Sequence, residues 1–429
     1  MTKIKPLQAL IYNPEKIKDL SRVVCPPYDI ISPQRQQYYH QLDPHNLIHV
    51  LLGKDIPGED KYLRAAGYFQ DWLKDKILIQ EKNPAIYFYS HHYSLNGEKK
   101  VRLGLIGLLP LGDKLASAFG HEHTRLEPKE DRLRLLRQVK ANLSPIFVLF
   151  SDKKRIIPYL EQSYLQGKKP FIDISDDEKN THKLWRLDSA DIIQAVQEKV
   201  STENIFIADG HHRYEVACAY REEMCLQYAN LSGEEPFNYL LAYFTSIESK
   251  GLTVFPIHRL VKLEQKVDLE NFKQKIKEYF EIEELKDRVK FFFLMQKAGK
   301  SEHVLGSYAE NKYLLMRLRN IKILDELIKD KPKEYRLLDV AILNHLILKK
   351  ILGLDLEDKE NISFTPEAEE VIARVAGNQR QMGFFLNPVP VQQITAVALS
   401  GNKMPPKSTY FYPKVLSGLV INKFNEGKS

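Results

Sequence analysis

An apolar segment that stops at an Asp-Gly pair and continues as a helix constrains the fold of this chain most strongly. Residues 205–208 read Ile-Phe-Ile-Ala, a buried type of strand, and Asp209-Gly210 marks a turn. Apolar residues then recur at helical spacing over 213–228. Where a buried strand leads directly into a helix, helices and strands must pack against each other around one core. The segment therefore predicts a fold that mixes both.

The remaining apolar patterns extend this prediction along the chain. Helical spacing predicts helices over 33–41, 61–75, 130–138, 190–199, 268–280, 335–352, 366–376 and 391–398. Alternating or continuous apolar runs predict strands over 85–93, 101–110, 145–150, 239–247, 252–255, 289–295, 304–308 and 313–318. The first two of these strands flank Asn96-Gly97, a strong hairpin signal.

Helices and strands do not alternate regularly, which argues against Rossmann and TIM-barrel folds. We predict an α+β (irregular α/β) protein with mixed sheets and flanking helices. A length of 429 residues favours more than one domain. We expect an N-terminal α/β region over 1–262 that carries the Asp-Gly-His-His-Arg motif. A C-terminal α+β region over 263–429 is expected to return the 404–414 loop to the same site.

Composition excludes several classes of protein. Lys and Arg total 63 against 56 Asp and Glu, and a net charge of +7 spread over this length argues against a nucleic-acid partner. No apolar run is long enough to span a membrane or to act as a signal peptide, so we expect a cytoplasmic protein. Three cysteines, among them Cys25 before Pro26-Pro27, do not indicate a disulfide framework.

The residues after 208 carry the densest chemistry. A helix N-terminus presents unpaired N–H groups to a phosphate, and Gly210 lets a ligand approach the backbone closely. Arg213 offers a bidentate fork for phosphate oxygens. Asp209 can bind Mg²⁺ or accept a proton, and His211 or His212 can donate to a phosphoryl oxygen. The alternative is a structural junction in which Asp209 only caps the helix.

A second polar cluster spans residues 120–125, where His121 and His123 flank Glu122 and precede Arg125. Two histidines beside a glutamate suggest a metal site. In an extended segment, however, they face opposite sides, and the cluster lacks the His-Glu-x-x-His spacing. We place the cluster at the active site; the alternative is a polar loop before a helix.

Two Pro-bounded segments complete the candidates. Tyr28 and Asp29 end the segment 24–29, whose two prolines form a rigid loop that can place both side chains at the mouth of a site. The segment 404–414 combines lysines, hydroxyl groups and aromatic rings, which fits contact with an anion or a nucleotide. The alternatives are a turn packed by its tyrosine and an aromatic loop packed on the core.

Standard nucleotide, hydrolase and kinase motifs do not occur in the sequence. The chain has no Gly-x-x-x-x-Gly-Lys-Ser/Thr loop, no Gly-x-Gly-x-x-Gly, no Gly-x-Ser-x-Gly elbow and no kinase His-Arg-Asp set. The largest families of these enzymes are therefore excluded.

Six segments resemble, in order and spacing, the family named "domain of unknown function 1015". These segments are 24–29, 120–125, 142–150, 208–215, 338–352 and 404–414. A shorter stretch, Asp209-Gly210-His211-His212-Arg213, is similar to the phosphate-binding motif of the ParB/sulfiredoxin superfamily, which includes partition proteins and free-serine kinases. This second resemblance implies a ParB/sulfiredoxin-like element around 200–260. It also implies ATP or another nucleotide, together with Mg²⁺, as cofactors.

The resemblance to the serine kinases implies a role for each motif residue. Gly210 to Arg213 would hold phosphates, Asp209 and His212 would serve the transfer, and Glu122 is the candidate for the separate catalytic glutamate. Sulfiredoxin activity requires a cysteine where His211 stands, so the sequence departs from that branch.

The leading hypothesis is a nucleotide-dependent phosphotransferase that acts on a small hydroxyl substrate, an amino acid such as serine being one example. The catalytic residues would be Asp209, which would also bind the metal, with His212 and Glu122. The residues assigned to phosphate or nucleotide are Gly210, His211, Arg213, Arg125, Lys407, Ser408 and Thr409, and Lys414 is also expected to face the anion. Those assigned to the substrate are Tyr28, Asp29, His121 and His123. The alternatives are a nucleotide- or DNA-linked binding module of ParB type and a metal-dependent hydrolase that uses His121, His123, His211 and His212.

Overall fold

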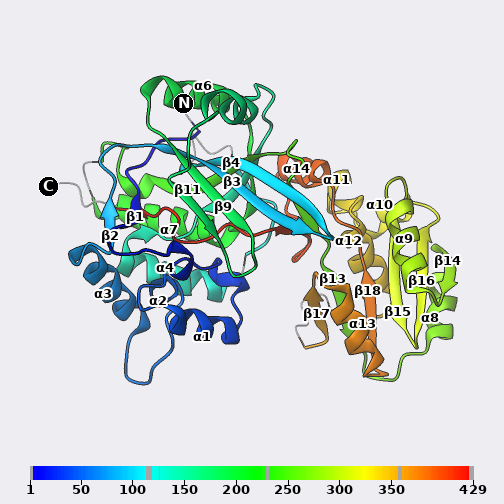
Figure 1. The fold of residues 1–429 in the computed structure, drawn as a ribbon. Coiled ribbons are helices and arrows are strands. Elements are labelled where there is room, and N and C mark those ends of the chain that lie inside the picture. Colours follow the sequence, from blue (N-terminus) through cyan, green and yellow to red (C-terminus); the bar gives the residue numbers. More distant parts are fainter. Residues whose placement is uncertain (1–2, 113–117, 125, 229–230, 356–359, 425–429) are drawn as a thin grey trace. The chain divides into compact units, whose positions relative to one another are not determined.

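The protein folds into two compact units in the computed structural model (Figure 1). The structure describes residues 3–112, 118–124, 126–228, 231–355 and 360–424. Unit 1 comprises residues 1–120, 124–252 and 413–429, and unit 2 comprises residues 121–123 and 253–412. The domain ranges expected from the sequence, 1–262 and 263–429, stay predictions, because a compact unit need not be a domain that folds independently.

Unit 1 contains a mixed eight-stranded sheet. In spatial order its strands are β5 (Ala118–Phe119), β10 (Ile205–Asp209), β7 (Ile146–Phe150), β11 (Tyr239–Ser246), β4 (Glu98–Pro110), β3 (Ile86–Leu95), β9 (Thr181–Leu187) and β8 (Ile172–Ser175). The pairs β5–β10 and β7–β11 are parallel, and the other pairs are antiparallel. The predicted mixed sheet is therefore confirmed.

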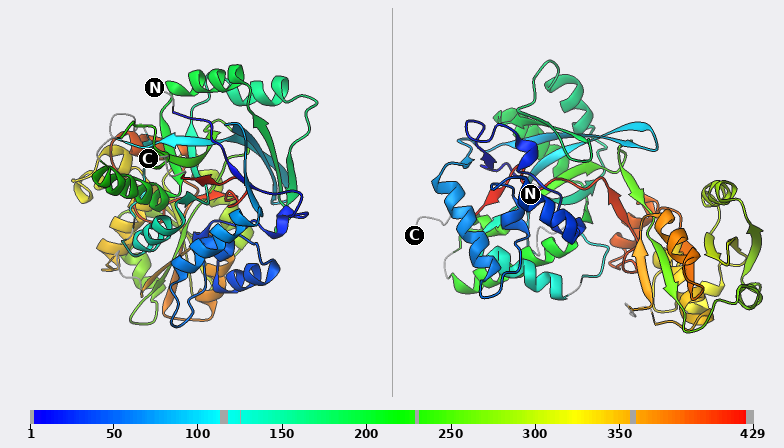
Figure 2. Two further views of the ribbon diagram at one scale, coloured as in Figure 1. Left: turned by 90° about the vertical axis from the view of Figure 1, so that its left-hand side faces the viewer. Right: turned by 60° about the horizontal axis from the view of Figure 1, so that its bottom comes forward.

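Helices cover both faces of this sheet. They are α1 (Pro33–Leu42), α2 (Ile48–Leu51), α3 (Lys61–Lys74), α4 (Leu126–Val139), α5 (Ile156–Tyr159), α6 (Ala190–Ser201) and α7 (His211–Gln227). Figures 1 and 2 show α6 on one face, and α3, α4 and α7 on the other. Val196 of α6 belongs to the core cluster beneath the central strands, whereas Phe69 and Trp72 of α3 belong to a second core cluster. The cluster with Val196 also includes Ala217 of α7, so it has members on both faces of the sheet.

The end of the chain returns through unit 1 as an extended segment. Its last strand, β20 (Asn422–Lys423), pairs with β6 (Ala141–Asn142), and another two-stranded sheet joins β1 (Leu10–Tyr12) to β2 (Leu78–Gln80). The Leu10 N–H donates to the Ile421 carbonyl at 2.9 Å, and Ile421 is fully buried. Residues 413–424 are therefore part of the core of unit 1.

The hairpin predicted at Asn96-Gly97 is confirmed. β3 ends at Leu95 and β4 begins at Glu98, so these two residues form the whole turn. Both have positive φ, 51° and 81°, as a type I′ turn requires. The resulting pair of long strands places their side chains in a fixed register across the sheet.

Unit 2 contains an antiparallel six-stranded sheet. In order its strands are β14 (Phe280–Leu285), β16 (Lys312–Leu318), β15 (Val304–Ala309), β18 (Gln381–Phe385), β13 (His258–Lys262) and β17 (Ile362–Thr365), and β12 (Thr253–Phe255) pairs separately with β19 (Tyr410–Tyr412). The helices are α8 (Leu269–Ile276), α9 (Arg288–Ala298), α10 (Ile323–Leu327), α11 (Lys333–Arg336), α12 (Asp339–Ile342), α13 (Ala368–Ala376) and α14 (Val391–Leu399). Phe291 of α9 and Val371 of α13 pack with Phe385 of β18 in the core.

The strand predicted over 289–295 is wrong, because this segment is part of helix α9. The Asp287 carboxylate accepts a hydrogen bond from the Lys290 N–H at 2.6 Å and caps the helix. Phe291 and Met295 are buried one turn apart, whereas Phe293 is exposed. A helix that is apolar on both sides shows no helical period in its sequence.

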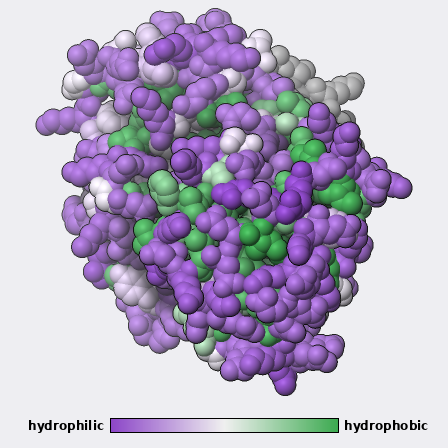
Figure 3. Space-filling view, turned by 90° about the vertical axis from the view of Figure 1, so that its right-hand side faces the viewer, coloured by the Kyte–Doolittle hydropathy of each residue, from purple (hydrophilic) through white to green (hydrophobic). Residues whose placement is uncertain are grey.

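The face of the molecule seen in Figure 3 is mostly hydrophilic, with hydrophobic residues gathered toward its middle.

Two predicted helices of unit 2 also differ in extent. The helix expected over 268–280 ends at Ile276, and Phe280 already begins β14. The long helix expected over 335–352 is divided into α11, α12 and a π-helical segment, Leu343–Ile351. A π-helix has i→i+5 hydrogen bonds, and a periodicity of apolar residues does not distinguish it from an α-helix over so short a length.

The predicted class, α+β with mixed sheets and flanking helices, is confirmed. The ParB/sulfiredoxin-like element expected around 200–260 corresponds to β10, α7 and β11, and its likeness to that superfamily stays a prediction. Among the described residues, every helix is too short or too polar to cross a bilayer.

Candidate functional site

The junction between β10 and α7 has a backbone that only glycine fits well. Gly210 has φ +89° and ψ 28°, in the left-handed region. A Cβ at this position would lie 2.8 Å from Cγ2 of Ile146 and 3.0 Å from Nη2 of Arg213. The strand therefore turns into the helix without a side chain at the turn, because Ile146 and Arg213 occupy the space that a Cβ would need.

Asp209 lies at the end of β10 between two cationic side chains. Its Oδ2 accepts a hydrogen bond from Nη2 of Arg213 at 2.9 Å, and its Oδ1 accepts one from Nζ of Lys414. All three side chains are largely buried, with 14%, 12% and 7% exposed for Asp209, Arg213 and Lys414. Burial opposes ionisation of the carboxyl, but Lys414 and Arg213 outweigh it and lower the pKa of Asp209 to about 2.

Lys414 reaches Asp209 because the end of the chain is held in unit 1. The Pro413 carbonyl accepts a hydrogen bond from Nη2 of Arg102 at 2.7 Å. Arg102 is fully buried, and its guanidinium lies 4.6 Å and 5.4 Å from the ring centroids of Phe147 and Tyr243. These contacts fix the backbone next to Lys414, and hence the position of its ammonium group.

A small cavity of about 60 Å³ lies beside the junction in unit 1. Its lining includes Tyr28, Arg132, Ser144 and Arg213 together with apolar side chains. The Arg132 guanidinium lies 4.4 Å from the centroid of the Tyr28 ring. Burial is the main cause that raises the pKa of Tyr28 to about 12, so this phenol stays protonated and can donate a hydrogen bond. The structure thus brings Tyr28 and Arg213 together at one cavity.

The other predicted residues of unit 1 are arranged around the start of α7. His211 is buried, and a Cβ at Gly120 would lie 3.4 Å from its Cδ2 atom. His212 is half-buried on the first turn, whereas Asp29 is exposed in the short 3₁₀ helix Tyr28–Ile30. Cys25 is buried and burial raises the pKa of its thiol, which excludes an activated thiolate there. Arg125 lies outside the described residues.

A second group of predicted residues lies in unit 2. Nε2 of His121 is 3.3 Å from Oγ1 of Thr409, and the Met404 N–H donates to the His121 carbonyl at 2.7 Å. Buried Ser408 donates its hydroxyl to the Pro405 carbonyl at 2.5 Å. Glu122 is half-buried, and Lys407 and His123 are exposed. Residue His121 therefore contacts the 404–409 loop, and the assignment of these residues to one site stays a prediction.

Two metal predictions can be compared with the geometry. A divalent ion on Asp209 would have to displace Lys414, since both carboxylate oxygens bind cationic side chains. These residues do not fit a Mg²⁺ ion in the described arrangement, and the assignment of Asp209 as a metal ligand stays a prediction. Among the described residues, the group whose ligand atoms lie close enough for one ion consists of His91, Asp176 and His182. None of the histidines assigned to a hydrolase belongs to it.

Sequence reasoning missed two arginines that shape this site. Arg102 lies within strand β4, and Arg132 lies on helix α4, and both are buried. An arginine in a strand or an amphipathic helix usually marks a solvent-exposed face. No local pattern distinguishes the two buried ones, because their partners, Pro413 and Tyr28, are distant in sequence.

The fold and the site define a mixed α/β protein with a positively charged strand-to-helix junction. The chain belongs to the family described as "Protein of unknown function (DUF1015)", whose model matches residues 4–341. The resemblance found in the sequence is thereby confirmed. A comparison with curated proteins finds no match.

Several solved structures are similar to the chain at low identity. A free serine kinase variant in complex with ADP is 12% identical, with 73% of this chain and 92% of that chain covered and a TM-score of 0.35. SbnI with a C-terminal truncation, from Staphylococcus aureus, is 11% identical, with 73% and 85% covered and a TM-score of 0.36. A conserved hypothetical protein from Pyrococcus furiosus is 12% identical, with 71% and 90% covered and a TM-score of 0.32. TM-scores this low carry no argument about the function of this chain.

Proposed function

We propose that the chain is a nucleotide-dependent phosphotransferase that acts on a small hydroxyl substrate, with the β10–α7 junction as its phosphate site. The observation that carries this proposal is the charge balance at Gly210. One carboxylate, Asp209, faces two cations, Arg213 and Lys414, so these three side chains together carry one net positive charge. The N-terminus of α7, a helix of 17 residues, adds about half a positive charge. A phosphate group has the charge and the hydrogen-bond acceptors that such a place favours.

The residues of the junction have different parts in the proposed reaction. Arg213 and the first N–H groups of α7 would hold the phosphates, because phosphoryl transfer depends mainly on positioning and charge neutralisation. The Asp209 carboxyl, with a pKa of about 2, is a weak base and would keep Arg213 and Lys414 in place. His212, on the first turn of α7, is the better candidate to orient or deprotonate the attacking hydroxyl. A serine-like acceptor comes from the resemblance of the motif to that of the free-serine kinases.

The two alternatives have less support. A binding module of ParB type shares the same phosphate contacts, and it would bind a nucleotide without transferring its phosphate. A metal-dependent hydrolase that uses His121, His123, His211 and His212 has no observation in its favour, because the candidate metal group among the described residues contains none of these four histidines.

Nucleotide binding and transfer test the proposal in one series. Calorimetry with ATP, ADP and Mg²⁺ is expected to show binding to the full chain, and Arg213→Gln should weaken it by at least about tenfold. Arg221→Gln is the matched control, because Arg221 lies on the same helix but bonds to Oδ1 of Asn238 at 2.8 Å. If R213Q and R221Q bind nucleotide as well as the wild type does, the junction is not the phosphate site.

A coupled assay for ADP release, with serine and other small alcohols as acceptors, separates transfer from binding alone. His212→Ala should lower the rate by about 10²–10⁴-fold and leave nucleotide binding nearly unchanged. Nucleotide binding without release of ADP for any acceptor would instead favour the binding module.

A further inference from the structure

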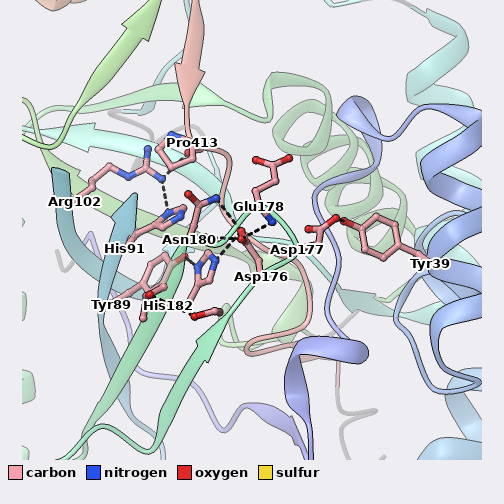
Figure 4. A network of polar contacts seen from close by, with 12 residues as sticks. Tyr39, Tyr89, His91, Arg102, Asp176, Asp177, Glu178, Asn180, His182 and Pro413 are labelled. Atoms are coloured by element: carbon pink, nitrogen blue, oxygen red, sulfur yellow. Dashed lines mark hydrogen bonds and ion pairs between the residues drawn. The ribbon is translucent and has the colours of Figure 1, made fainter. Parts of the chain in front are cut away.

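A buried cluster at the other end of the large sheet of unit 1 has the composition of a metal site. His91 on β3 and His182 on β9 are directly opposite each other in the register of the two strands. Their ring centroids are 4.3 Å apart, and both side chains are fully buried. Asp176 follows β8 at the turn into β9, and Figure 4 shows its carboxylate facing the His182 ring. Two imidazoles and a carboxylate thus meet at one place.

The distances within the cluster suit one ion. One ligand atom from each of the three residues lies within 4.8 Å of the others. Nε2 of His182 is 3.1 Å from Oδ2 of Asp176. In a tetrahedral site with bonds of about 2.0–2.1 Å, ligand atoms lie roughly 3.3 Å apart, so this pair already has the required separation. Asp176 is about 10% exposed, which leaves a path for an ion and for a water ligand.

The groups around the cluster hold its ligands in place. Nδ1 of His182 is 2.6 Å from the Tyr89 hydroxyl. The hydroxyl oxygen can accept a hydrogen bond from a protonated Nδ1, which leaves Nε2 free of its proton and able to bind a metal. Asp176 accepts hydrogen bonds from the Asn180 N–H at 2.8 Å and from its side-chain amide at 3.0 Å. Nε2 of His91 is buried and has no hydrogen-bond partner among the described residues. A buried polar atom without a partner is costly, and a metal ion would satisfy it.

We propose that His91, His182 and Asp176 bind a divalent transition-metal ion of the zinc type, with water as the fourth ligand. Two imidazoles favour zinc, cobalt or nickel over Mg²⁺ and Ca²⁺, which prefer oxygen ligands. The ion would join β3, β9 and the β8–β9 turn, and it would therefore stabilise this edge of the sheet. The site is separate from the β10–α7 junction and does not depend on the phosphotransferase proposal.

One neighbouring charge opposes the ion. Nη2 of Arg102 is 3.3 Å from Nδ1 of His91, and a guanidinium can only donate, so the neutral ring carries its proton on Nε2. Metal binding through Nε2 moves this proton to Nδ1 and opens the long contact with Arg102, which keeps its 2.7 Å bond to the Pro413 carbonyl. The charges of Arg102 and Asp176 cancel, and the ion meets a locally neutral site.

Metal analysis of the tag-free full chain tests the proposal. Protein purified without chelators is expected to contain about one zinc per chain by inductively coupled plasma mass spectrometry. After removal of the metal, titration with Co²⁺ should produce the visible absorption of a tetrahedral site. Zn²⁺ should raise the unfolding temperature by mass action. Asp176→Asn and His182→Gln should weaken Co²⁺ binding by at least about tenfold.

Two control variants separate ligand loss from a general effect on the sheet. His92→Ala removes the neighbouring histidine of β3, which points to the opposite face and bonds to Ser90 at 2.9 Å. Asp173→Asn removes a carboxylate of β8 that pairs with Lys183 at 3.1 Å. Both should bind Co²⁺ as the wild type does. The proposal is wrong if the metal-free wild type takes up neither Co²⁺ nor Zn²⁺, or if D176N and H182Q bind them as tightly as H92A and D173N do.

Discussion

Asp209 is the acidic member of a largely buried trio of charged side chains in unit 1. Its carboxylate pairs with Arg213 and Lys414, two largely buried cations. A buried charge without a partner is expensive, so each member of this trio depends on the others. Because the trio has one more positive than negative charge, it stays attractive to an anion while it is internally paired.

Replacement of Lys414 should measure how strongly this trio stabilises the fold. Lys414→Met removes one cation and leaves the Asp209 carboxylate with Arg213 alone. We expect a loss of about 2–3 kcal/mol in the free energy of unfolding at pH 7, measured by urea denaturation. Lys407→Met is the control, because Lys407 is exposed, and it should change stability by less than about 0.5 kcal/mol.

The same pair of proteins gives the pH dependence. The pKa of Asp209 is about 2 in the folded chain, against an ordinary value of 3.8 for an aspartate. A carboxyl with a depressed folded pKa adds stability above its unfolded pKa, and this stability is lost as the pH falls from about 4 to about 2. The difference between wild type and K414M should therefore shrink at pH 3. An equal difference at pH 7 and pH 3 would show that Lys414 acts through packing and not through the charge of Asp209.

For single residues, the sequence predicts a structural role that follows from the neighbouring residues in the chain. It does not predict a role that depends on a partner distant in the sequence. Gly210 could be predicted because a strand that ends at Asp-Gly before a helix requires a turn. Lys414 pairs with the carboxylate of Asp209, a partner that the sequence does not indicate, and its expected contact with an anionic small molecule stays a prediction. The pairing of His91 with His182 could not be predicted, because it requires knowing that β3 and β9 are neighbours and in which register.

Helices and strands differ in how clearly the sequence shows them. The Asn-Gly turn predicts the β3–β4 hairpin, and the structure has the turn and both flanking strands at these residues. Helix α9 has apolar residues on both sides, so the run Phe291–Met295 has no period that separates a helix from a strand.

Residues 413–424 form an extended segment in the core of unit 1, and a substitution in this segment measures how much it stabilises the fold. Ile421 is fully buried and joins the core cluster that contains Leu10 and Phe69. We expect Ile421→Ala to lower the free energy of unfolding by about 3 kcal/mol, as a large-to-small change in a packed core does.

Ile321→Ala is the matched control for this change, since Ile321 is 39% exposed and should cost less than about 1 kcal/mol. Both free energies come from urea unfolding followed by circular dichroism. Equal effects of the two substitutions would mean that residues 413–424 do not contribute to the core.

In the whole molecule, the two units differ in which parts of the sequence form them. All six strands of the large sheet of unit 2 come from residues 258–385, so this unit is nearly continuous in sequence. Unit 1 requires residues 413–429 as well as residues before 253. The core of unit 1 is therefore complete only when residues 413–424 are present.

Two fragments should behave differently because of this arrangement. A fragment of residues 253–412 has its own sheet and core and should unfold cooperatively in urea, with dispersed amide signals in nuclear magnetic resonance. A fragment of residues 1–252 lacks Ile421 and the strand that pairs with β6, so it should be poorly soluble or unfold without a cooperative transition. Addition of a peptide of residues 413–424 should restore part of its structure, whereas the same peptide with Ile421→Asp should not. A fragment of residues 1–252 that folds as stably alone as in the full chain would show that the returning segment is dispensable for unit 1.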